Sequence, residues 1–411
     1  MSEAGRGTGS LNAVPGEHQK LFSVMYSRAS SLGSGSFGAV VQLYNNSTGD
    51  LYAGKIFLPD DDEDLPVETL RELAFLRIFS EHPHENIVTL VDACGSIDGQ
   101  RVPLAVLPLL PRTLASVIGT DALKTRERML IAKGLSEGLT HLHSSQPPIV
   151  HRDLKPENVL LGGDEAVTPV LIDFSFTKHL YLEEQREVKR KKVKRGVKKT
   201  SPEEAKNTEV LGTPTYIAPE ILKREPYGTP VDIWALGVVL LELFQNSRLE
   251  TDKDSQALRI LRDLKSRLSD KPVPRLIKQC LDEEQSLRPS AGHVCAELGG
   301  RPSSGFPYFE EGGPPHCPEI REWAKRLDYR GTQTIRAAEV YRERMHSSRH
   351  SAFFCVVVAG KLYEYSTWTM EDLEDFMNEF NPCELDDFQM QLLEKFKYNL
   401  LVPYPLHRRD S

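Results

Sequence analysis

A glycine-rich stretch near the N-terminal end has the composition of a phosphate-binding turn. It reads Leu32-Gly33-Ser34-Gly35-Ser36-Phe37-Gly38-Ala39-Val40. Glycine has no Cβ, so a turn built from it lets phosphate oxygens approach the backbone, whose N–H groups donate hydrogen bonds. Glycine turns also occur in plain β-hairpins. This stretch alone therefore leaves both interpretations open.

Further polar motifs follow the glycine-rich stretch in a fixed order. They are Tyr52-Ala53-Gly54-Lys55, His151-Arg152-Asp153-Leu154-Lys155-Pro156-Glu157-Asn158, Asp173-Phe174-Ser175 and Gly212-Thr213-Pro214-Thr215-Tyr216-Ile217-Ala218-Pro219-Glu220. The segment 151–158 is the most specific of these motifs, because all eight of its residues match a known motif in one uninterrupted run. In this order the motifs resemble those of the eukaryotic protein kinase superfamily, serine/threonine type.

The resemblance implies a role for each polar residue of the segment 151–158. Asp153 accepts or orients the proton of the substrate hydroxyl, Lys155 steadies the γ-phosphate, and Asn158 holds a magnesium ion. The lysine two positions after the aspartate is typical of serine/threonine kinases. Asp173 is implied as the other magnesium ligand.

Ser175 departs from the family pattern, which has glycine at this position. A side chain restricts the backbone torsions. We expect the substitution to affect the switching of the segment between active and inactive arrangements rather than its chemistry, because no magnesium ligand is lost.

The resemblance also implies an ATP site. Lys55 holds the α- and β-phosphates, and Glu72 on the following helix is the natural ion-pair partner that keeps the ammonium in place. Leu107 is the expected gatekeeper, followed by a hinge in which the carbonyl of Pro108 and the N–H of Leu110 bind adenine. Three apolar residues are expected to sandwich the base, although ordinary core packing explains them equally well: Val40, Ala53 and Leu160.

The segment from Asp173 to Glu220 is the expected site of regulation. Arg152 is implied as a ligand of a phosphate in this segment. The candidate phosphate acceptors are Thr200, Ser201, Thr208 and Thr213.

A strongly basic run, residues 186–199, lies inside the same segment. Residues 189–199 have three interpretations: a nuclear import signal read by an import receptor, a docking patch for an acidic partner, or a solvated insertion. The expected localisation is the nucleus, the cytoplasm or both.

The elements that position these residues alternate in type along the chain. Residues 26–57 show a strand, turn and strand pattern, residues 65–79 show helical spacing, and 87–91 and 102–107 resemble strands again. Residues 125–143 and 231–243 are predicted helices. The fold class is α+β, with a β-rich N-lobe and an α-rich C-lobe, as in the bilobal protein kinase fold.

Three regions are expected along the chain. Residues 1–25 are a flexible tail, residues 26–309 are the kinase domain, and residues 310–411 are a C-terminal α/β extension whose role the sequence does not reveal. Glu220 and Arg288 are expected to form a buried ion pair, and Asp232 to hold the segment 151–158 from a helix.

Composition narrows the class of protein further. A formal net charge of -8 disfavours direct binding to nucleic acid. The six cysteines are scattered and form no C-x-x-C pair, which favours buried reduced thiols. No secretory signal and no apolar stretch long enough for a membrane span is visible.

The function implied by the resemblance is transfer of the γ-phosphoryl group from ATP, with Mg²⁺, to serine or threonine hydroxyls of protein substrates. A nucleotide-binding pseudokinase scaffold is the alternative, suggested by Ser175 and the basic insertion. A small-molecule kinase on the same fold is disfavoured, because the motif 212–220 shapes a groove for protein substrates.

Overall fold

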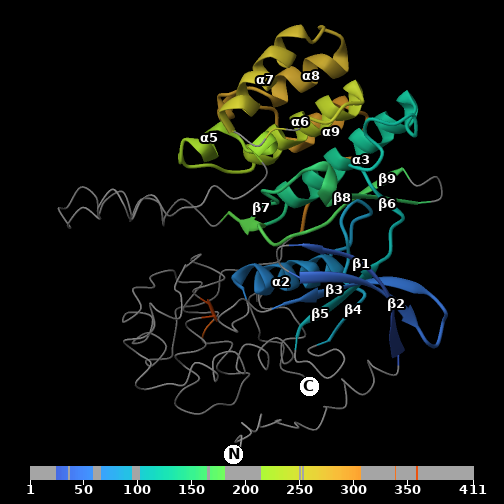
Figure 1. The fold of residues 1–411 in the computed structure, drawn as a ribbon. Helices are drawn as coiled ribbons and strands as arrows, with labels where there is room; N and C mark the ends of the chain where they lie inside the picture. Colours follow the sequence, from blue (N-terminus) through green and yellow to red (C-terminus); the bar gives the residue numbers. More distant parts are fainter. Residues whose placement is uncertain are drawn as a thin grey trace, which may run out of the picture. The chain divides into compact units, whose positions relative to one another are not determined.

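A computed structural model of the chain describes residues 25–35, 38–58, 66–94, 102–163, 167–180, 214–249, 251, 254–306, 338 and 358–359. These residues divide between two compact units (Figure 1). The sheet unit comprises the chain up to Leu58 together with Asp92–Leu109, and the helical unit comprises Pro59–Val91 together with the chain from Leu110 onward.

The sheet unit is built on a five-stranded antiparallel sheet with the strand order β1-β2-β3-β5-β4. Its strands are β1 (Tyr26–Gly35), β2 (Gly38–Asn45), β3 (Leu51–Phe57), β4 (Asp92–Cys94) and β5 (Leu104–Pro108). The turn between β2 and β3 is stabilised by Asn45, whose side-chain oxygen accepts hydrogen bonds from the N–H groups of Ser47 and Thr48. The strands and turns predicted over residues 26–57 are therefore confirmed, and they form an antiparallel meander.

One face of this sheet carries the core of the unit. The buried residues that pack together there are Tyr26, Val41, Leu43, Ile56, Cys94, Val102, Leu104 and Val106. Tyr52 packs at the edge of this cluster, with its ring edge-on to Tyr26 at 5.9 Å between centroids. Side chains alternate between the faces of a strand, so burial of this set leaves the alternate residues for the opposite face.

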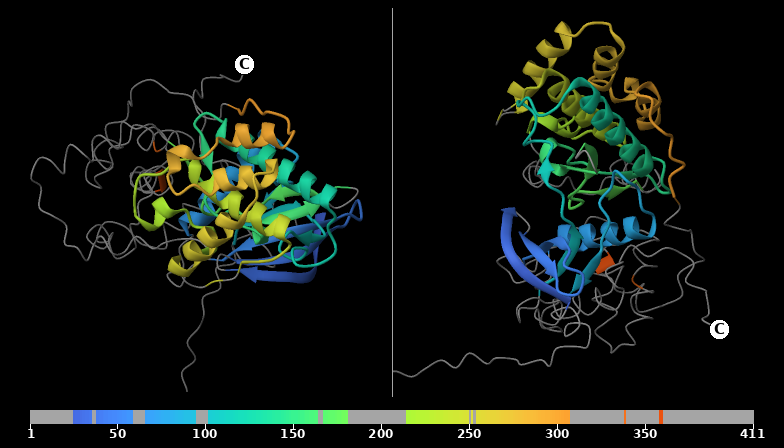
Figure 2. Two further views of the ribbon diagram at one scale, coloured as in Figure 1. Left: turned by 90° about the horizontal axis from the view of Figure 1, so that it is seen from above. Right: turned by 90° about the vertical axis from the view of Figure 1, so that its right-hand side faces the viewer.

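The helical unit contains most of the described helices and two small sheets. Its elements are α2 (Val67–Glu81), β6 (Arg112–Thr113), α3 (Thr125–His143), β7 (Ile149–Val150), η1 (Pro156–Asn158), β8 (Val159–Gly162), β9 (Thr168–Leu171), β10 (Lys178–His179), η3 (Pro214–Tyr216), α5 (Pro219–Leu222), α6 (Pro230–Gln245), α7 (Asp254–Arg267), α8 (Pro272–Cys280), η4 (Gln285–Leu287) and α9 (Ala291–Glu297). Helix α3 packs against α6, α9 and β9, and α8 packs against α6 (Figure 2). Strands β6, β8 and β9 form one sheet, and β7 pairs with β10.

The predicted helices over residues 125–143 and 231–243 are confirmed as α3 and α6. The strand prediction for residues 87–91 is wrong, because β4 begins only at Asp92. Ile87 makes an isolated bridge to Leu171, and the N–H of Leu90 donates to the hydroxyl of Ser80 at 2.8 Å. Ser80 donates in return to the carbonyl oxygen of Leu90 at 2.9 Å, so this segment binds the end of α2 instead of a neighbouring strand.

Burial accounts for the cysteines that the structure describes. Cys94, Cys280 and Cys295 are buried free thiols, as the scattered spacing predicts. None of the described helices combines the length and the apolar character that crossing a membrane requires.

The chain after α9 is held against α3. The N–H of Arg301 donates to the buried carboxylate of Glu137 at 2.6 Å, and the Ser303 hydroxyl lies 2.9 Å from Nδ1 of His141. The ring of Phe306 stacks on His82, with 4.6 Å between centroids. These contacts fix the path of the chain where the predicted kinase domain ends.

Three histidines surround the point where Phe306 is buried. The His141 ring lies 4.7 Å from that of His84 and 4.8 Å from that of Phe306, and burial lowers the pKa of His141 to about 4, with neighbouring His84 acting in the same direction. Burial also lowers the pKa of His84. The cluster is therefore stable with His141 uncharged.

Acidification is expected to destabilise the protein through His141. Its pKa is about 6.5 in an unfolded chain and about 4 when folded. The unfolded state consequently binds the extra proton, so the stabilisation is complete above about pH 6.5 and is lost as the pH falls toward 4. Urea denaturation between pH 7 and 5 measures this slope. His141→Asn is expected to flatten it, whereas substitution of the exposed His293 should leave it unchanged; an unaltered slope in His141→Asn would contradict the assignment.

Candidate active site

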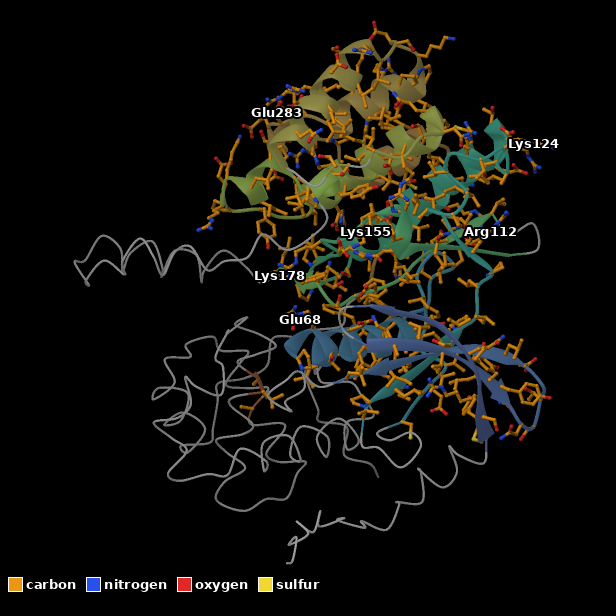
Figure 3. The ribbon with its side chains drawn as sticks, in the orientation of Figure 1. Glu68, Arg112, Lys124, Lys155, Lys178 and Glu283 are labelled. Atoms are coloured by element: carbon orange, nitrogen blue, oxygen red, sulfur yellow. The ribbon has the colours of Figure 1, made fainter. Side chains whose placement is uncertain are left out.

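Three polar side chains of the segment 151–158 meet in the helical unit. Lys155 Nζ donates to Asp153 Oδ2 at 2.8 Å, and Asn158 Nδ2 donates to the same oxygen at 2.7 Å and to the Asp153 carbonyl at 2.8 Å. Asp153 and Asn158 are buried. Lys155, which Figure 3 labels, is partly exposed. The structure thus brings together the predicted catalytic residues.

Asp232 holds the backbone of this segment from the first turn of α6. Its Oδ2 accepts from the N–H of His151 at 2.8 Å and its Oδ1 accepts from the N–H of Arg152 at 2.8 Å. His143, at the end of α3, lies 2.9 Å from Oδ2 through its Nε2. The predicted role of Asp232 is therefore confirmed, and His143 joins it.

Burial affects the two aspartates in opposite directions. Burial raises the pKa of Asp153, although neighbouring Lys155 acts against this effect. Burial would also raise the pKa of Asp232, but the hydrogen bond from His143 and that from the Arg152 N–H bring its pKa below the usual value. The charged form of Asp232 is consequently favoured, while the pKa of Asp153 moves closer to that of an effective base.

Arg152 and Asp173 both have left-handed backbone conformations, with φ of 68° and 63°. Residues other than glycine rarely adopt this region, and such strain persists only where the surroundings over-determine the conformation. For Arg152 those surroundings include the hydrogen bonds that the N–H groups of His151 and Arg152 donate to Asp232. No sequence pattern predicts these two conformations.

Asp173 is held by the residue that departs from the family pattern. Ser175 Oγ donates to Asp173 Oδ1 at 2.7 Å, and Arg71 Nη1 of α2 donates to the Ser175 carbonyl at 3.0 Å. Among the described residues, Ser175 is absent from those with positive φ. The side chain at this position therefore carries no left-handed strain here, and it orients a carboxylate.

Phe174 fixes the same segment by apolar contact. It is fully buried, and its ring centroid lies 4.6 Å from that of Phe79 of α2 and 5.1 Å from that of His151. The motif 173–175 is thus tied to both α2 and the segment 151–158.

Arg152 contacts the beginning of the segment from Asp173 to Glu220 and a residue that follows the end of this segment. Its Nε donates to the carbonyl of Phe176, and its Nη1 donates to the hydroxyl of Tyr227 at 2.8 Å. Its predicted phosphate acceptors lie outside the described residues, as does the basic run: Thr200, Ser201, Thr208, Thr213 and residues 186–199.

The predicted pair of Glu220 and Arg288 is present and buried. Nη1 and Nη2 of Arg288 donate to the two carboxylate oxygens of Glu220 at 2.6 and 2.8 Å. The guanidinium also lies 5.1 Å from the ring centroid of Trp234. A two-point bond of this kind fixes geometry more than it adds stability.

In the sheet unit, four predicted ATP-site residues share one face. Val40 pairs with Lys55 across β2 and β3, and Ala53 pairs with Leu107 across β3 and β5. Residues directly opposite in an antiparallel pair, and residues two apart in a strand, point to the same side. These side chains are less buried than the core on the other face.

The glycine-rich stretch forms the hairpin of β1 and β2, with Gly35 opposite Gly38. Gly38 has a φ of 148°, and a Cβ there would lie 1.9 Å from the carbonyl oxygen of Ile56, so only glycine fits. Leu32, Gly33 and Ser34 lie in β1, where Leu32 is exposed. Ser36 and Phe37 lie outside the described residues.

The remaining predicted positions belong to either unit. Glu72 is buried in α2 of the helical unit, and Leu160 of β8 pairs with Thr113. Pro108 ends β5 in the sheet unit, whereas Leu110 belongs to the helical unit and packs on Gly162. The Lys55–Glu72 pair and the adenine contacts stay predictions.

The chemistry of the donor set fits a magnesium ion. Asn158 uses its amide nitrogen for two hydrogen bonds to Asp153, which fixes its orientation and leaves the amide oxygen as the group that ligates a cation. Asp173 offers a carboxylate, and oxygen ligands of this type are those that Mg²⁺ prefers.

Comparison with known proteins agrees with this geometry. A family model described as "Protein kinase domain" matches residues 26–298, which is most of the chain. The chain belongs to the protein kinase family. Its α+β fold, with a sheet-rich part followed by a helical part, is the one that the motifs predict.

Several protein kinases are similar to this chain. Serine/threonine-protein kinase TIO of Arabidopsis thaliana is 32% identical over 218 residues, covering 52% of this chain and 14% of the relative. The liver/testis phosphorylase b kinase gamma catalytic chain of Mus musculus is 33% identical over 243 residues, covering 56% and 52%. Serine/threonine-protein kinase PAK 5 of Rattus norvegicus is 27% identical over 299 residues, covering 71% and 36%. The chain spans about half or less of the length of these kinases.

Sequence reasoning missed several residues around the kinase site. They are His143 beside Asp232, Tyr227 beside Arg152, and Arg71 beside Ser175. Each binds a residue of a recognised motif from a distant part of the chain. No local pattern signals such a contact, because it depends on the tertiary path.

Removal of the Ser175 hydroxyl tests its role as the residue that orients Asp173. Ser175→Ala deletes one hydrogen bond to a charged group, worth about 1.5 kcal/mol or somewhat more. We expect the magnesium concentration for half-maximal activity to rise about tenfold, with little change in thermal stability. Ser80→Ala, which removes a partly buried hydroxyl bonded to Leu76 and Leu90 and not to Asp173, is the control. An unchanged magnesium dependence in Ser175→Ala would contradict this role.

Proposed function

We propose that this chain is an active serine/threonine protein kinase that transfers the γ-phosphoryl group of ATP to hydroxyl groups of protein substrates. The observation that carries the proposal is the cluster in which Lys155 and Asn158 both bind the carboxylate of Asp153, with Asp232 fixing the backbone beneath it. The names of the similar kinases support the serine/threonine class.

Asp153 acts as the base or orienting group for the substrate hydroxyl. Its raised pKa increases its affinity for a proton, and its two hydrogen-bond donors hold the carboxylate in one orientation. Positioning of this kind is the main contribution that a kinase makes, since phosphoryl transfer needs little covalent chemistry from the protein. Lys155 adds a positive charge next to the site of transfer.

ATP and Mg²⁺ are the cofactors that protein kinases use. When bound, Mg²⁺ would supply positive charge that neutralises the negative charge developing during transfer. Asn158 and Asp173 are the residues that would hold it, and Ser175 and Arg71 keep the Asp173 segment in place. Lys55, Val40, Ala53 and Leu107 are the residues of the sheet unit proposed to bind ATP.

A protein is the favoured substrate, and its phosphorylation is the favoured reaction. No observation favours the pseudokinase scaffold, because the predicted catalytic set is complete and Ser175 orients Asp173 instead of disrupting it.

We also propose that a phosphate between residues 200 and 213 binds Arg152. The two groups to which Arg152 donates are neutral oxygens, so neither compensates its charge.

Replacement of Asp153 tests the proposed reaction. Asp153→Asn keeps the size of the side chain and removes the base, so we expect the turnover number to fall at least about a hundredfold. Phosphate transfer from labelled ATP to a basic protein and to a peptide library measures it, with thermal unfolding as the check on folding. Asp263→Asn, in an exposed ion pair with Arg267, is the matched control. Full activity of Asp153→Asn would overturn the proposal.

A further inference from the structure

A partly buried polar cluster lies beside the catalytic segment and has no part in the proposed reaction. Arg248, in the loop after α6, donates from Nη2 to Glu157 Oε1 at 2.6 Å, and its Nε lies 3.4 Å from Glu242 Oε1. The hydroxyl of Tyr216 donates to Glu242 Oε2 at 2.8 Å. One guanidinium therefore contacts two carboxylates.

The position of Glu157 makes this cluster relevant to a substrate. Glu157 directly precedes Asn158 in the catalytic segment, and its side chain is 48% exposed, whereas that of Glu242 is fully buried. Without Arg248, this surface would present negative charge next to Asp153. A negative surface attracts basic side chains of an approaching polypeptide.

The loop that carries Arg248 is held in place independently of its side chain. The N–H of Leu249 donates to Glu242 Oε1 at 2.6 Å, and the Thr215 hydroxyl donates to the Leu249 carbonyl at 3.1 Å. Burial raises the pKa of Glu242, and the bonds from Leu249, Tyr216 and Arg248 act against that effect. The backbone beside Arg248 is consequently fixed, and the guanidinium is held by its contacts with Glu157 and Glu242.

Arg248 also forms one wall of a cavity of about 170 Å³. The other lining residues are Thr215, Leu249, Thr251, Ala257, Ile260 and Leu261. This volume is well below the roughly 300 Å³ at which small-molecule sites begin, and the lining is mostly apolar. The cavity therefore suits one aliphatic side chain better than a metabolite or a cofactor.

The cavity adjoins the motif 212–220, which is expected to shape the groove for protein substrates. Thr215 lies within the motif 212–220, two positions after Thr213, and in η3. One contact of Arg248 leads to the catalytic segment, through Glu157, and the cavity wall leads to this motif, through Thr215 and Leu249. Glu157 also lies four positions after Asp153, the residue proposed to act on the substrate hydroxyl.

We propose that Arg248 is a specificity-determining residue, which occupies the carboxylates of Glu157 and Glu242 and converts this surface into a subsite for an aliphatic side chain of the protein substrate. The proposal rests on the proposed kinase activity. A lysine or arginine of the substrate meets a fixed guanidinium here and finds its carboxylate partners already occupied, which is discrimination by an unfavourable contact. A leucine or isoleucine enters the cavity instead.

Peptide pairs that differ only in leucine or arginine at one position measure this preference. A positional scan with the wild-type chain identifies the position where aliphatic residues are favoured over basic ones. Arg248→Met keeps the aliphatic stem and removes the charge. We expect it to shift the ratio of kcat/KM for the two peptides by about tenfold or more toward arginine, by exposing Glu157.

Two further variants keep the test decisive. Ile260→Phe fills the cavity and is expected to reduce the preference for leucine about tenfold without making arginine favourable. Arg262→Met breaks the exposed ion pair with Glu283 and should leave both preferences unchanged (Figure 3). If Arg248→Met fails to fold, Ile260→Phe carries the test.

Binding of the same labelled peptides, followed by fluorescence polarisation, separates this proposal from the proposed activity. A wild-type chain that binds the leucine peptide more tightly but transfers no phosphate would disprove the activity and support the subsite. An unaltered leucine-to-arginine ratio in folded Arg248→Met, or in Ile260→Phe, would overturn the subsite, whether or not the wild type is active.

Discussion

The hydrogen bonds of Asp232 are the constraint on which the rest of the site depends. This carboxylate is completely buried, and burying a charge costs several kcal/mol unless partners compensate for it. Two backbone N–H groups and His143 provide that compensation. Because both N–H groups belong to the residues that precede Asp153, the charge and the catalytic carboxylate are coupled: a stable Asp232 requires the left-handed turn at Arg152, and that turn sets the direction of Asp153.

Helix α6 is suited to this task because its residues from Val231 to Leu243 are all buried. A helix that is covered on every side cannot shift without disturbing its neighbours. It carries Asp232 in its first turn and Glu242 near its end. Glu242 fixes the loop at Leu249 and binds Tyr216, so one helix positions both the catalytic segment and the wall of the cavity beside it. The segment proposed to be catalytic and the proposed substrate subsite therefore share a single scaffold.

A second path of contacts leads from the same segment to α2. His151 packs on Phe174, Phe174 packs on Phe79, and Arg71 binds the carbonyl of Ser175. The motif 173–175 thus lies between the catalytic segment and the helix that carries Glu72. Serine in place of glycine strengthens this arrangement, because its hydroxyl binds Asp173. This contact places Ser175 beside a predicted magnesium ligand. Its effect on switching stays a prediction.

The sequence predicted the elements better than the contacts between them. The helices at 125–143 and 231–243 and the strands within residues 26–57 were accessible because periodicity is a local property. The roles of Asp232, Glu220 and Arg288 were implied by the resemblance of their motifs to the kinase family. The segment 87–91 was misassigned, since its apolar residues resemble a strand while its backbone binds Ser80. The left-handed turns at Arg152 and Asp173 and the position of Arg248 beside Glu157 were inaccessible, because each depends on where a distant part of the chain returns.

The dependence of the site on Asp232 is tested most directly by hydrogen exchange of the peptide that contains His151 and Arg152, measured together with kcat in Asp232→Asn. We expect hydrogen exchange to become faster and kcat to fall, each by about tenfold or more, since an amide cannot accept both N–H groups as a carboxylate does. Unchanged exchange together with an unchanged kcat would contradict it.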